Sequence, residues 1–498
     1  MTTMPDRKAL EGGMRYGFRP MAVAAGAALI VFIASLYANP VTAQTGGIHK
    51  IKHIIIIMQE NRTFDSYFGT FPGADGIPMK NGVPTVGIVD PITGKIVRPF
   101  HDPDDRNFDS PHMVANAFED IDDGKMDGFI RSAMTEYKRF QNMALLKESN
   151  KKLRNSSLKE YKELMYTNKG RPVQRPLYLD CMGYHDQREI PNYWTYAKDF
   201  VLQDHMFEPI LSWSFPTHLC MISAWSAITE VPGDPLSCVT NLDPPDRSEK
   251  DTEPFAWTDI TYLLHKNHVS WKYYLDEKEL LKKPEYNWID IPEETVPTIW
   301  DILPGFVDVH EDHEVKNDEV IANFFKAAKE GALPQVCWVI PNFKDSEHSP
   351  SLVSTGQAFV TRVINAIMKS PDWTSSAIFL SWDDWGGFYD HVVPSRVDEF
   401  GYGIRVPGLV ISPYAKKGYI DRQILSHDAY LKFIEDDFCG GQRIDPKTDG
   451  RPDSRPDVRE NEPLLGDLVK DFDFSQTPRP PMVLPPYPKK VDDLGGSH

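Results

Sequence analysis

Glu60-Asn61 and Asp383-Asp384 are pairs of neighbouring residues with oxygen-bearing side chains, and each pair follows closely on an apolar run. The adjacent carboxylates of Asp383 and Asp384 repel one another unless a cation or a proton lies between them. Carboxylate and amide oxygens are the ligands that hard divalent cations of the Ca²⁺, Mg²⁺ and Mn²⁺ class take. We therefore expect both pairs to hold one oxygen-liganded divalent cation. For Asp383 and Asp384 the alternative is a helix cap or a solvent-exposed pair.

A hydroxyl group that could act as a nucleophile lies in a different motif. Ser214 stands two residues before Pro216. Since proline is favoured in the first turn of a helix, Ser214 is predicted at or near a helix N-cap. Unpaired backbone N–H groups and the positive helix end favour an alkoxide there and also bind phosphate oxygens. Serine needs an activator to become a nucleophile, and a nearby cation would be one. Without a cation, Ser214 would be an ordinary cap.

Several apolar runs have the β-branched composition of strands that are buried on both faces of a sheet. They alternate with helical patterns, which predicts an α/β fold with a mainly parallel central sheet flanked by helices. In such sheets ligands bind at the carboxyl ends of strands, so the two oxygen-bearing pairs should meet there. The predicted strands are 51–58, 336–340, 376–381 and 406–412, and the predicted helices are 192–198, 216–228, 320–330 and 355–368.

The 498-residue chain carries a formal charge of −18. This acidic balance argues against a nucleic-acid partner, because the protein's field repels phosphate polymers. The N-terminus has a basic lead, an apolar run over 21–37 and small residues before position 44. This pattern predicts a signal peptide over 1–43, hence export to the periplasm or the medium and no stable membrane span after its removal. An uncleaved membrane anchor is the alternative.

Ordered motifs carry a resemblance to a known family. They are IIIIMQENRTFDSYFGTFPG (54–73), Ser-Phe-Pro-Thr-His (214–218), Glu-His-Ser-Pro (347–350) and SWDDWGGFYDHVVP (381–394). Their types and order resemble the phosphoesterase family of bacterial phospholipases C and related acid phosphatases. The likeness spans about residues 50 to 440. It implies one catalytic domain over 47–498, with insertions near 131–180 and 240–300 and a Pro-rich C-terminal tail, on an alkaline-phosphatase-like fold.

The resemblance also implies roles for individual residues. Ser214 matches the nucleophile that lies against the metal, and Asp109 and His112 match an early Asp/His segment. His348 and the Asp390-His391 pair match positions that bind phosphate or transfer protons. Thr217-His218 and Asp384 depart from the residues that are common in the family. The predicted catalytic residues are Ser214, His348 and His391, the substrate-binding residues are His112, His218 and Asp390, and the metal ligands are Glu60, Asn61, Ser214, Asp383 and Asp384.

The expected activity is metal-dependent hydrolysis of phosphate esters through a serine nucleophile. Phospholipase C-like cleavage of phosphodiesters is favoured, so the partner would be a phosphoester, with phospholipids among the candidates. An acid phosphatase that acts on monoesters is one alternative, and a catalytically silent exported binding protein on the same fold is another. The turn-rich segment 445–463 is interpreted as a solvated loop. The sequence leaves the oligomeric state open.

Overall fold

The computed structural model describes residues 47–148, 174–245, 253–276 and 299–488. The predicted signal peptide, 1–43, lies outside the described residues, as do parts of both predicted insertions. Among the described residues, no helix combines the length and the apolar character needed to cross a membrane.

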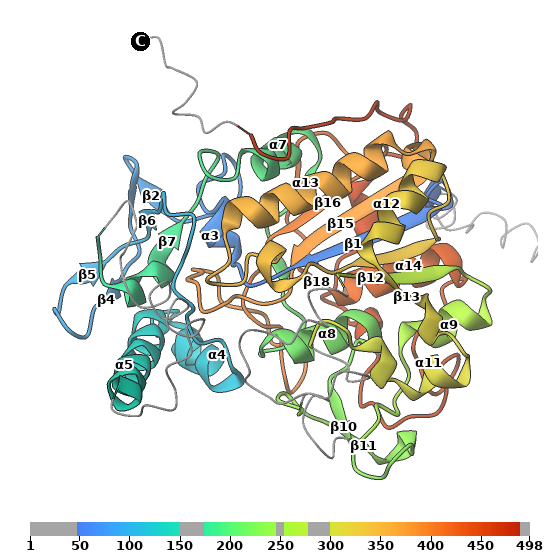
Figure 1. The fold of residues 1–498 in the computed structure, drawn as a ribbon, viewed down its shortest axis with the longest axis horizontal. Coiled ribbons are helices and arrows are strands. Elements are labelled where there is room, and N and C mark those ends of the chain that lie inside the picture. Colours follow the sequence, from blue (N-terminus) through green and yellow to red (C-terminus); the bar gives the residue numbers. More distant parts are fainter. Residues whose placement is uncertain (1–46, 149–173, 246–252, 277–298, 489–498) are drawn as a thin grey trace, which may run out of the picture. The chain divides into compact units, whose positions relative to one another are not determined.

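An eight-stranded sheet forms the centre of the described chain (Figure 1). Its neighbours are parallel except around β16, which runs antiparallel to β15 and to β8. This arrangement confirms the predicted α/β fold with a mainly parallel central sheet. The strand order is β13 (Asp318–Val320), β12 (Trp271–Leu275), β14 (Val336–Val339), β1 (His53–Gln59), β15 (Ser376–Trp382), β16 (Gly408–Ile411), β8 (Val201–Gln203) and β17 (Tyr419–Asp421).

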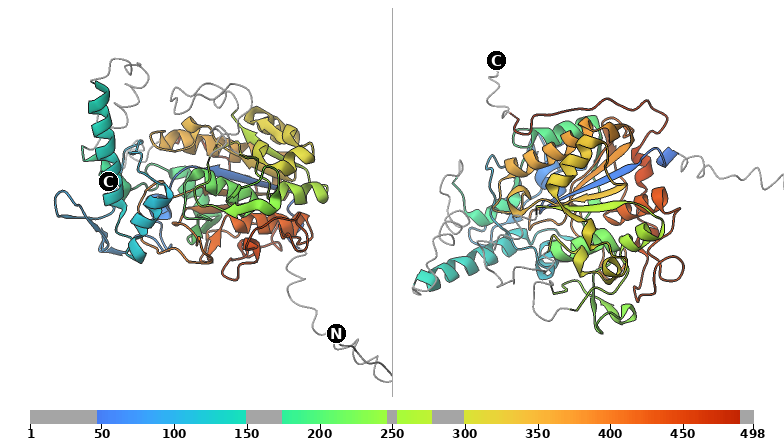
Figure 2. Two further views of the ribbon diagram at one scale, coloured as in Figure 1. Left: turned by 90° about the horizontal axis from the view of Figure 1, so that it is seen from below. Right: turned by 45° about the vertical axis from the view of Figure 1, so that its right-hand side comes forward.

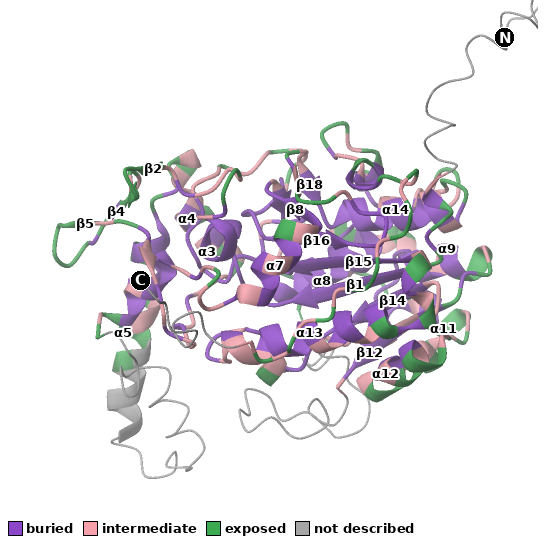
Figure 3. Ribbon diagram, turned by 90° about the horizontal axis from the view of Figure 1, so that it is seen from above, coloured by how far each residue is buried: buried purple, intermediate pink, exposed green. Residues whose placement is uncertain are grey.

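The strands β1 and β15 lie side by side in the middle of this sheet, in register from His53 opposite Ser376 to Gln59 opposite Trp382. Every residue of β15 is buried, and so is every residue of β1 after His53. A strand with water on neither face gains stability from apolar side chains on both faces, which explains its continuous apolar run. Figure 3 shows the buried strands at the centre of the fold and the exposed segments around them.

Helices flank the sheet in two groups that are defined by their mutual packing (Figure 1). One group contains α7 (Pro191–Asp199), α12 (Ile321–Glu330) and α13 (Val353–Lys369); the other contains α8 (Ser214–Ser223), α9 (Ile260–Lys266) and α14 (Asp428–Phe438), with α11 (Val307–Glu311) against α9. The helices predicted at 192–198, 320–330 and 355–368 are confirmed. The prediction over 216–228 is wrong at its C-terminal end, because Ala224 has a left-handed backbone that ends α8.

Short two-stranded sheets and a second hydrophobic cluster surround this core. The second cluster is built on α4 (Val114–Ile121) and α5 (Phe129–Glu148), and α3 (Phe64–Phe68) follows β1. The short pairs are β2 (Met79–Lys80) with β3 (Val83–Pro84), β4 (Ile88–Val89) with β5 (Ile96–Val97), β6 (Phe100–His101) with β7 (Gly183–Tyr184), β9 (Met206–Phe207) with β18 (Leu425–Ser426), and β10 (Ala227–Thr229) with β11 (Cys238–Thr240).

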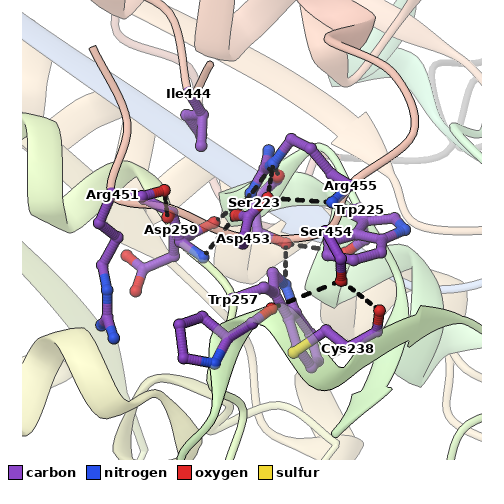
Figure 4. A network of polar contacts seen from close by, with 12 residues as sticks. Ser223, Trp225, Cys238, Trp257, Asp259, Ile444, Arg451, Asp453, Ser454 and Arg455 are labelled. Carbon is purple, nitrogen blue, oxygen red and sulfur yellow. Dashed lines mark hydrogen bonds and ion pairs between the residues drawn. The ribbon is translucent and has the colours of Figure 1, made fainter. Parts of the chain in front are cut away.

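The segment after α14 anchors the C-terminal end of α8 (Figure 4). The buried guanidinium of Arg455 donates to the carbonyl of Ser223, the last residue of α8, at 3.0 Å. It also pairs with Asp453 at 2.9 Å, and Asp453 accepts from the backbone N–H of Thr258 at 3.1 Å. A cation at the C-terminus of a helix offsets its negative dipole end. The solvated-loop interpretation of 445–463 is therefore wrong for these residues.

All five cysteines of the chain lie among the described residues, and each is a buried free thiol. Burial raises the pKa of each thiol above its usual range. Since the thiolate is the reactive form, these residues behave as small apolar side chains.

Candidate active site

The pairing of β1 with β15 brings the two predicted oxygen-bearing pairs together. Gln59 and Trp382 are the last residues of the two strands and lie opposite one another. The backbone N–H of Asp383 donates to the carbonyl of Gln59 at 2.9 Å, so the ladder continues one residue further. Glu60 and Asp383 are therefore neighbours at the carboxyl edge of the sheet, and both are buried.

Asn61 links the two strand ends. Its backbone N–H donates to the Oδ1 atom of Asp383 at 3.0 Å, and its side-chain Nδ2 donates to the Oδ1 atom of Asp384 at 3.1 Å. Asn61 has a left-handed backbone with φ of 58°, which turns the chain sharply after β1. Gly386 lies against this turn, where a Cβ atom would come within 2.6 Å of the Asn61 Cβ. Only glycine fits there without a shift of the loop.

Ser214 is the first residue of α8, as its position before Pro216 predicts, and it is buried. Its Oγ atom lies 3.0 Å from Asp384 Oδ2 and 3.2 Å from Glu60 Oε2. The hydroxyl thus lies between two carboxylates that come from the ends of different strands. In the first turn of a helix the backbone N–H groups lack the partners that later turns have, and Ser214 stands in the first turn of α8.

His218 lies four residues after Ser214, so both side chains project from one face of α8. Its Nε2 atom lies 3.5 Å from Glu60 Oε1 and 3.7 Å from Asp383 Oδ2. The ring is fully buried, and neither ring nitrogen has a hydrogen-bond partner. The prediction assigned His218 to substrate binding. The structure places it among the predicted metal ligands.

The pKa values of the buried acidic groups shift in opposite directions. Burial and the nearby Asp383 raise the pKa of Glu60, and burial together with Asp383 and Glu60 raises the pKa of Asp384 well above its usual range. Burial also opposes ionisation of Asp383, yet the adjacent His218 lowers the pKa of Asp383 to about 2. The two carboxylates outweigh the effect of burial on His218 and raise its pKa to about 9. The cluster therefore favours a positive charge at its centre.

Glu60, His218 and Asp383 could hold a metal ion, since one ligand atom of each lies within 4.8 Å of the other two. The buried atoms Asp383 Oδ2, Asn61 Oδ1 and His218 Nε2 lack hydrogen-bond partners. Leaving buried polar atoms unpaired is costly, and a bound cation would satisfy them. The residues therefore fit a divalent cation. The donor set contains an imidazole nitrogen as well as the predicted oxygens.

His112 and His348 lie beside this cluster. The Nε2 atom of His112 accepts from Asn61 Nδ2 at 3.0 Å, and its Nδ1 donates to the carbonyl of Ser110 at 2.8 Å. The ring of His348 packs edge-to-face on His112 with the ring centroids 5.5 Å apart. Burial and the nearby His348 lower the pKa of His112, which favours the neutral ring. The structure thus brings both histidines next to the Glu60–Ser214 cluster.

Asp390 and His391 belong to a separate ion-pair group that is centred on the fully buried Arg405. The guanidinium of Arg405 lies 3.1 Å from Asp390 Oδ1 and 3.0 Å from Asp65 Oδ1. The Nδ1 atom of His391 lies 2.8 Å from Asp65 Oδ2. Asp390 also accepts from the backbone N–H of Asp65 at 3.1 Å, in the first turn of α3. Their contacts are with this group and not with Ser214.

We expect His391→Gln to lower stability more at pH 6 than at pH 9. Burial disfavours the imidazolium of His391, but Asp65 outweighs it and raises the pKa. A raised histidine pKa adds stability that is fully present below the unfolded pKa of about 6.5 and is lost as the pH rises through the folded pKa. The expected loss at pH 6 is about 1–2 kcal/mol. Thermal unfolding of both proteins at both pH values measures it, and an equal loss at both would contradict the ion pair.

Two further residues at the cluster did not stand out in the sequence. The indole N–H of Trp300 donates to Glu60 Oε1. Burial and the nearby Asp384 raise the pKa of Glu208 well above its usual range. Trp300 follows a charged stretch with no recognisable motif, so no sequence signal marks it. The spacing of Ser214 and His218 was a usable signal, because residues four apart share a helix face.

Comparison with known proteins identifies the class. The family model of the Phosphoesterase family matches residues 51–439, and the chain belongs to this family. Membership makes it a hydrolase that acts on phosphoric ester bonds. Phospholipase C B of Mycobacterium tuberculosis is 24% identical over 496 aligned residues, which cover 87% of this chain and 80% of the relative. Non-hemolytic phospholipase C of Burkholderia pseudomallei is 25% identical over 510 aligned residues, which cover 91% of this chain and 63% of the relative.

Among solved structures, a protein in the alkaline phosphatase superfamily from Vibrio parahaemolyticus is similar to this chain at 14% identity. The match covers 55% of this chain and 66% of that chain, with a TM-score of 0.30. A score of this size does not assign a fold, so the alkaline-phosphatase-like part of the fold prediction stays a prediction. The α/β class rests on the sheet and its helices.

Proposed function

We propose that this protein hydrolyses phosphodiesters, in the manner of a phospholipase C, with Ser214 as the nucleophile and a divalent cation as cofactor. The observation that carries the proposal is the position of the Ser214 hydroxyl. It lies between Glu60 and Asp384 at the edge where β1 and β15 end, beside buried ligand atoms that lack partners. The relatives that are named phospholipase C support the choice of diesters.

Glu60, Asn61, Asp383, Asp384, Ser214 and His218 are the residues that would hold the cation. When bound, it would supply Lewis-acid stabilisation of phosphoryl oxygens and favour the ionised form of the serine hydroxyl. The imidazole of His218 shifts the expected preference from Ca²⁺ or Mg²⁺ toward Mn²⁺ and other transition metals, because imidazole is a ligand of intermediate softness.

Ser214 performs the first step. Its hydroxyl oxygen attacks phosphorus as its proton passes to the carboxylate of Glu60 or Asp384, which accept its hydrogen bond, and the bond between phosphorus and the leaving oxygen breaks. The N-terminal N–H groups of α8 offset charge on the phosphoryl oxygens. Because the hydroxyl is buried and held by two acceptors, it needs little reorganisation before attack.

His348 is the proposed general acid for the leaving oxygen. It is partly exposed and packs on His112, which contacts Asn61 in the cluster. A partly exposed imidazole can recover its proton from water between turnovers, as a general acid must. His391 is less suited, since it pairs with Asp65 in the Arg405 group, which is separate from the Ser214 cluster. Water then releases the phosphorylated product from Ser214. The predicted export fits an enzyme that meets its substrate outside the cytoplasm.

The proposal is tested by turnover of p-nitrophenyl phosphorylcholine, a diester, and p-nitrophenyl phosphate, a monoester, with the same leaving group. We expect kcat/KM for the diester to exceed that for the monoester by about tenfold or more, which is within the range that binding contacts give. A higher value for the monoester would indicate an acid phosphatase. No turnover of either ester, with the cation supplied, would indicate a binding protein and contradict the proposal.

A further inference from the structure

The segment Met79–Arg98, termed the hairpin arm here, projects from the fold as two small hairpins, β2–β3 and β4–β5 (Figures 1 and 2). The chain enters the arm after α3, which begins just beyond Glu60-Asn61, and leaves it through β6 toward His112. Both ends of the arm therefore lead directly into segments that form the candidate active site.

The two faces of β4–β5 are both apolar, although only one is covered. Ile88 and Val97 are opposite one another and contact the second hydrophobic cluster, which contains α4 and α5. Val89 and Ile96 form the next cross-strand pair and are exposed, at 56% and 59%. Antiparallel hairpins usually place polar side chains on the solvent face. No element of the described chain covers this apolar pair.

Other exposed apolar side chains lie in the same arm. Ile92, in the turn between β4 and β5, is 58% exposed, and Val83 in β3 is 56% exposed. Met79 at the start of β2 is also exposed. Of the fifteen exposed large hydrophobic residues in the described chain, five lie in the hairpin arm. A concentration of this kind marks an interaction site and not a random surface.

The exposed charges on the arm are of one sign. Lys80, Lys95 and Arg98 are all exposed, in a chain whose formal charge is −18. The single acidic residue of the arm, Asp90, is buried and accepts from the backbone N–H of Ile92 at 2.9 Å within its own turn. The surface of the arm thus combines apolar side chains with basic ones, which is the composition that binds anionic lipid interfaces.

We propose that the hairpin arm docks on an anionic phospholipid surface, with Val89, Ile92 and Ile96 entering the interface and the basic side chains contacting the lipid phosphates. The exposed basic side chains favour this partner over a basic or an uncharged apolar surface. The proposal deepens the proposed function, because it would bring the active site to substrates that stand in a membrane. Its test does not require turnover.

The β10–β11 hairpin offers a matched control. It also exposes apolar side chains, Val231, Leu236 and Val239, at 46–65%. However, residues 230–243 contain the acidic residues Glu230, Asp234 and Asp243 and no lysine or arginine. The two hairpins are therefore alike in exposed apolar residues and opposite in charge.

The experiment measures co-sedimentation of the purified protein with vesicles of phosphatidylcholine that contain phosphatidylglycerol. We expect the triple variant Val89→Thr, Ile92→Thr, Ile96→Thr to bind about tenfold or more weakly than the wild type. Threonine keeps the β-branched shape and the strand preference, so the hairpin should still form. The control triple variant Val231→Thr, Leu236→Thr, Val239→Thr should bind as the wild type does. Equal loss in both variants would overturn the proposal.

The contribution of the basic side chains is tested separately. Lys80→Glu with Lys95→Glu should remove binding to the anionic vesicles, and raising the salt concentration should weaken wild-type binding. Vesicles of phosphatidylcholine alone should bind the wild type about tenfold or more weakly. Wild-type protein that stays in the supernatant with anionic vesicles would overturn the proposal and leave the exposed face to a protein partner.

The result is separable from the hydrolytic function. The hairpin-arm variants should turn over water-soluble p-nitrophenyl esters at the wild-type rate, since their side chains lie outside the site. Conversely, Ser214→Ala should bind vesicles normally. Vesicle binding without any ester turnover would contradict the proposed function alone, and turnover without vesicle binding would contradict the docking surface alone.

Discussion

Ser214→Ala is expected to lower kcat for p-nitrophenyl esters by about 10⁴-fold or more, because no other hydroxyl takes its place between Glu60 and Asp384. If the metal site alone activated water for direct attack, the variant would keep a large part of the rate. The measurement therefore decides whether a serine-bound intermediate forms at all. A burst of p-nitrophenol at high wild-type concentration, absent from the variant, would support the same step.

The fold should tolerate this change. Alanine is a good helix former, and the single O–H of Ser214 is shared between Glu60 and Asp384, so the loss of its hydrogen bond should cost about 1 kcal/mol. Ser212→Ala is the matched control, since Ser212 is also buried, lies two residues away, and donates instead to the carbonyl of Leu242. We expect the control to keep its activity. Full activity in Ser214→Ala would exclude Ser214 as the nucleophile.

The second large effect is expected for Asp383→Asn, which should abolish the stabilisation of the protein by added cation. In the wild type a cation at 100 times its dissociation constant would raise stability by about 2.7 kcal/mol. The variant removes one of the charges that the cation would neutralise and should gain far less. Thermal unfolding with Mn²⁺, Mg²⁺ or Ca²⁺ added singly measures this gain and ranks the metals.

Without a cation the Asp383→Asn protein should unfold at nearly the same temperature as the wild type. Asp383 adds to the repulsion that raises the pKa of Glu60 and Asp384, so its loss relieves that repulsion while it removes the partner of His218. Asp437→Asn is the matched control, because Asp437 is also a buried carboxylate paired with a histidine, His49, at 2.9 Å. The control should respond to the cation as the wild type does. A Mn²⁺-induced shift in Asp383→Asn equal to the wild-type shift would contradict the metal site.

The sequence alone predicted the long central strands that are buried on both faces. The strands β1 and β15 are buried on both faces, so their residues carry an unbroken apolar pattern, and the residues that follow them could be placed at one edge of the sheet. The strand β12 was missed because it begins with the alternating residues Trp271, Lys272 and Tyr273. The antiparallel direction of β16 has no local signal, since apolar runs look alike in both directions.

At the candidate site, too, the sequence predicted the residues that directly follow a strand but not those whose position depends on tertiary contacts. Glu60, Asn61, Asp383 and Asp384 follow predicted strands, and the structure brings them together with Ser214. Asp390 and His391 follow the same strand in sequence, yet the chain turns at Gly386 and carries them to Arg405. That turn depends on close packing with Asn61, which is a tertiary contact that no local pattern encodes.

The central position of β1 has a consequence for how this protein comes to be folded. The first strand of the described chain acquires its neighbours only when residues beyond 330 are available, and the Asn61–Asp383 contact closes a loop of 322 residues. Contacts of such long range are slow to form, so a growing chain stays without its central strand pairing until most of it has been made. The candidate active site therefore cannot assemble before Asp383 and Asp384 have been made and β15 has paired with β1.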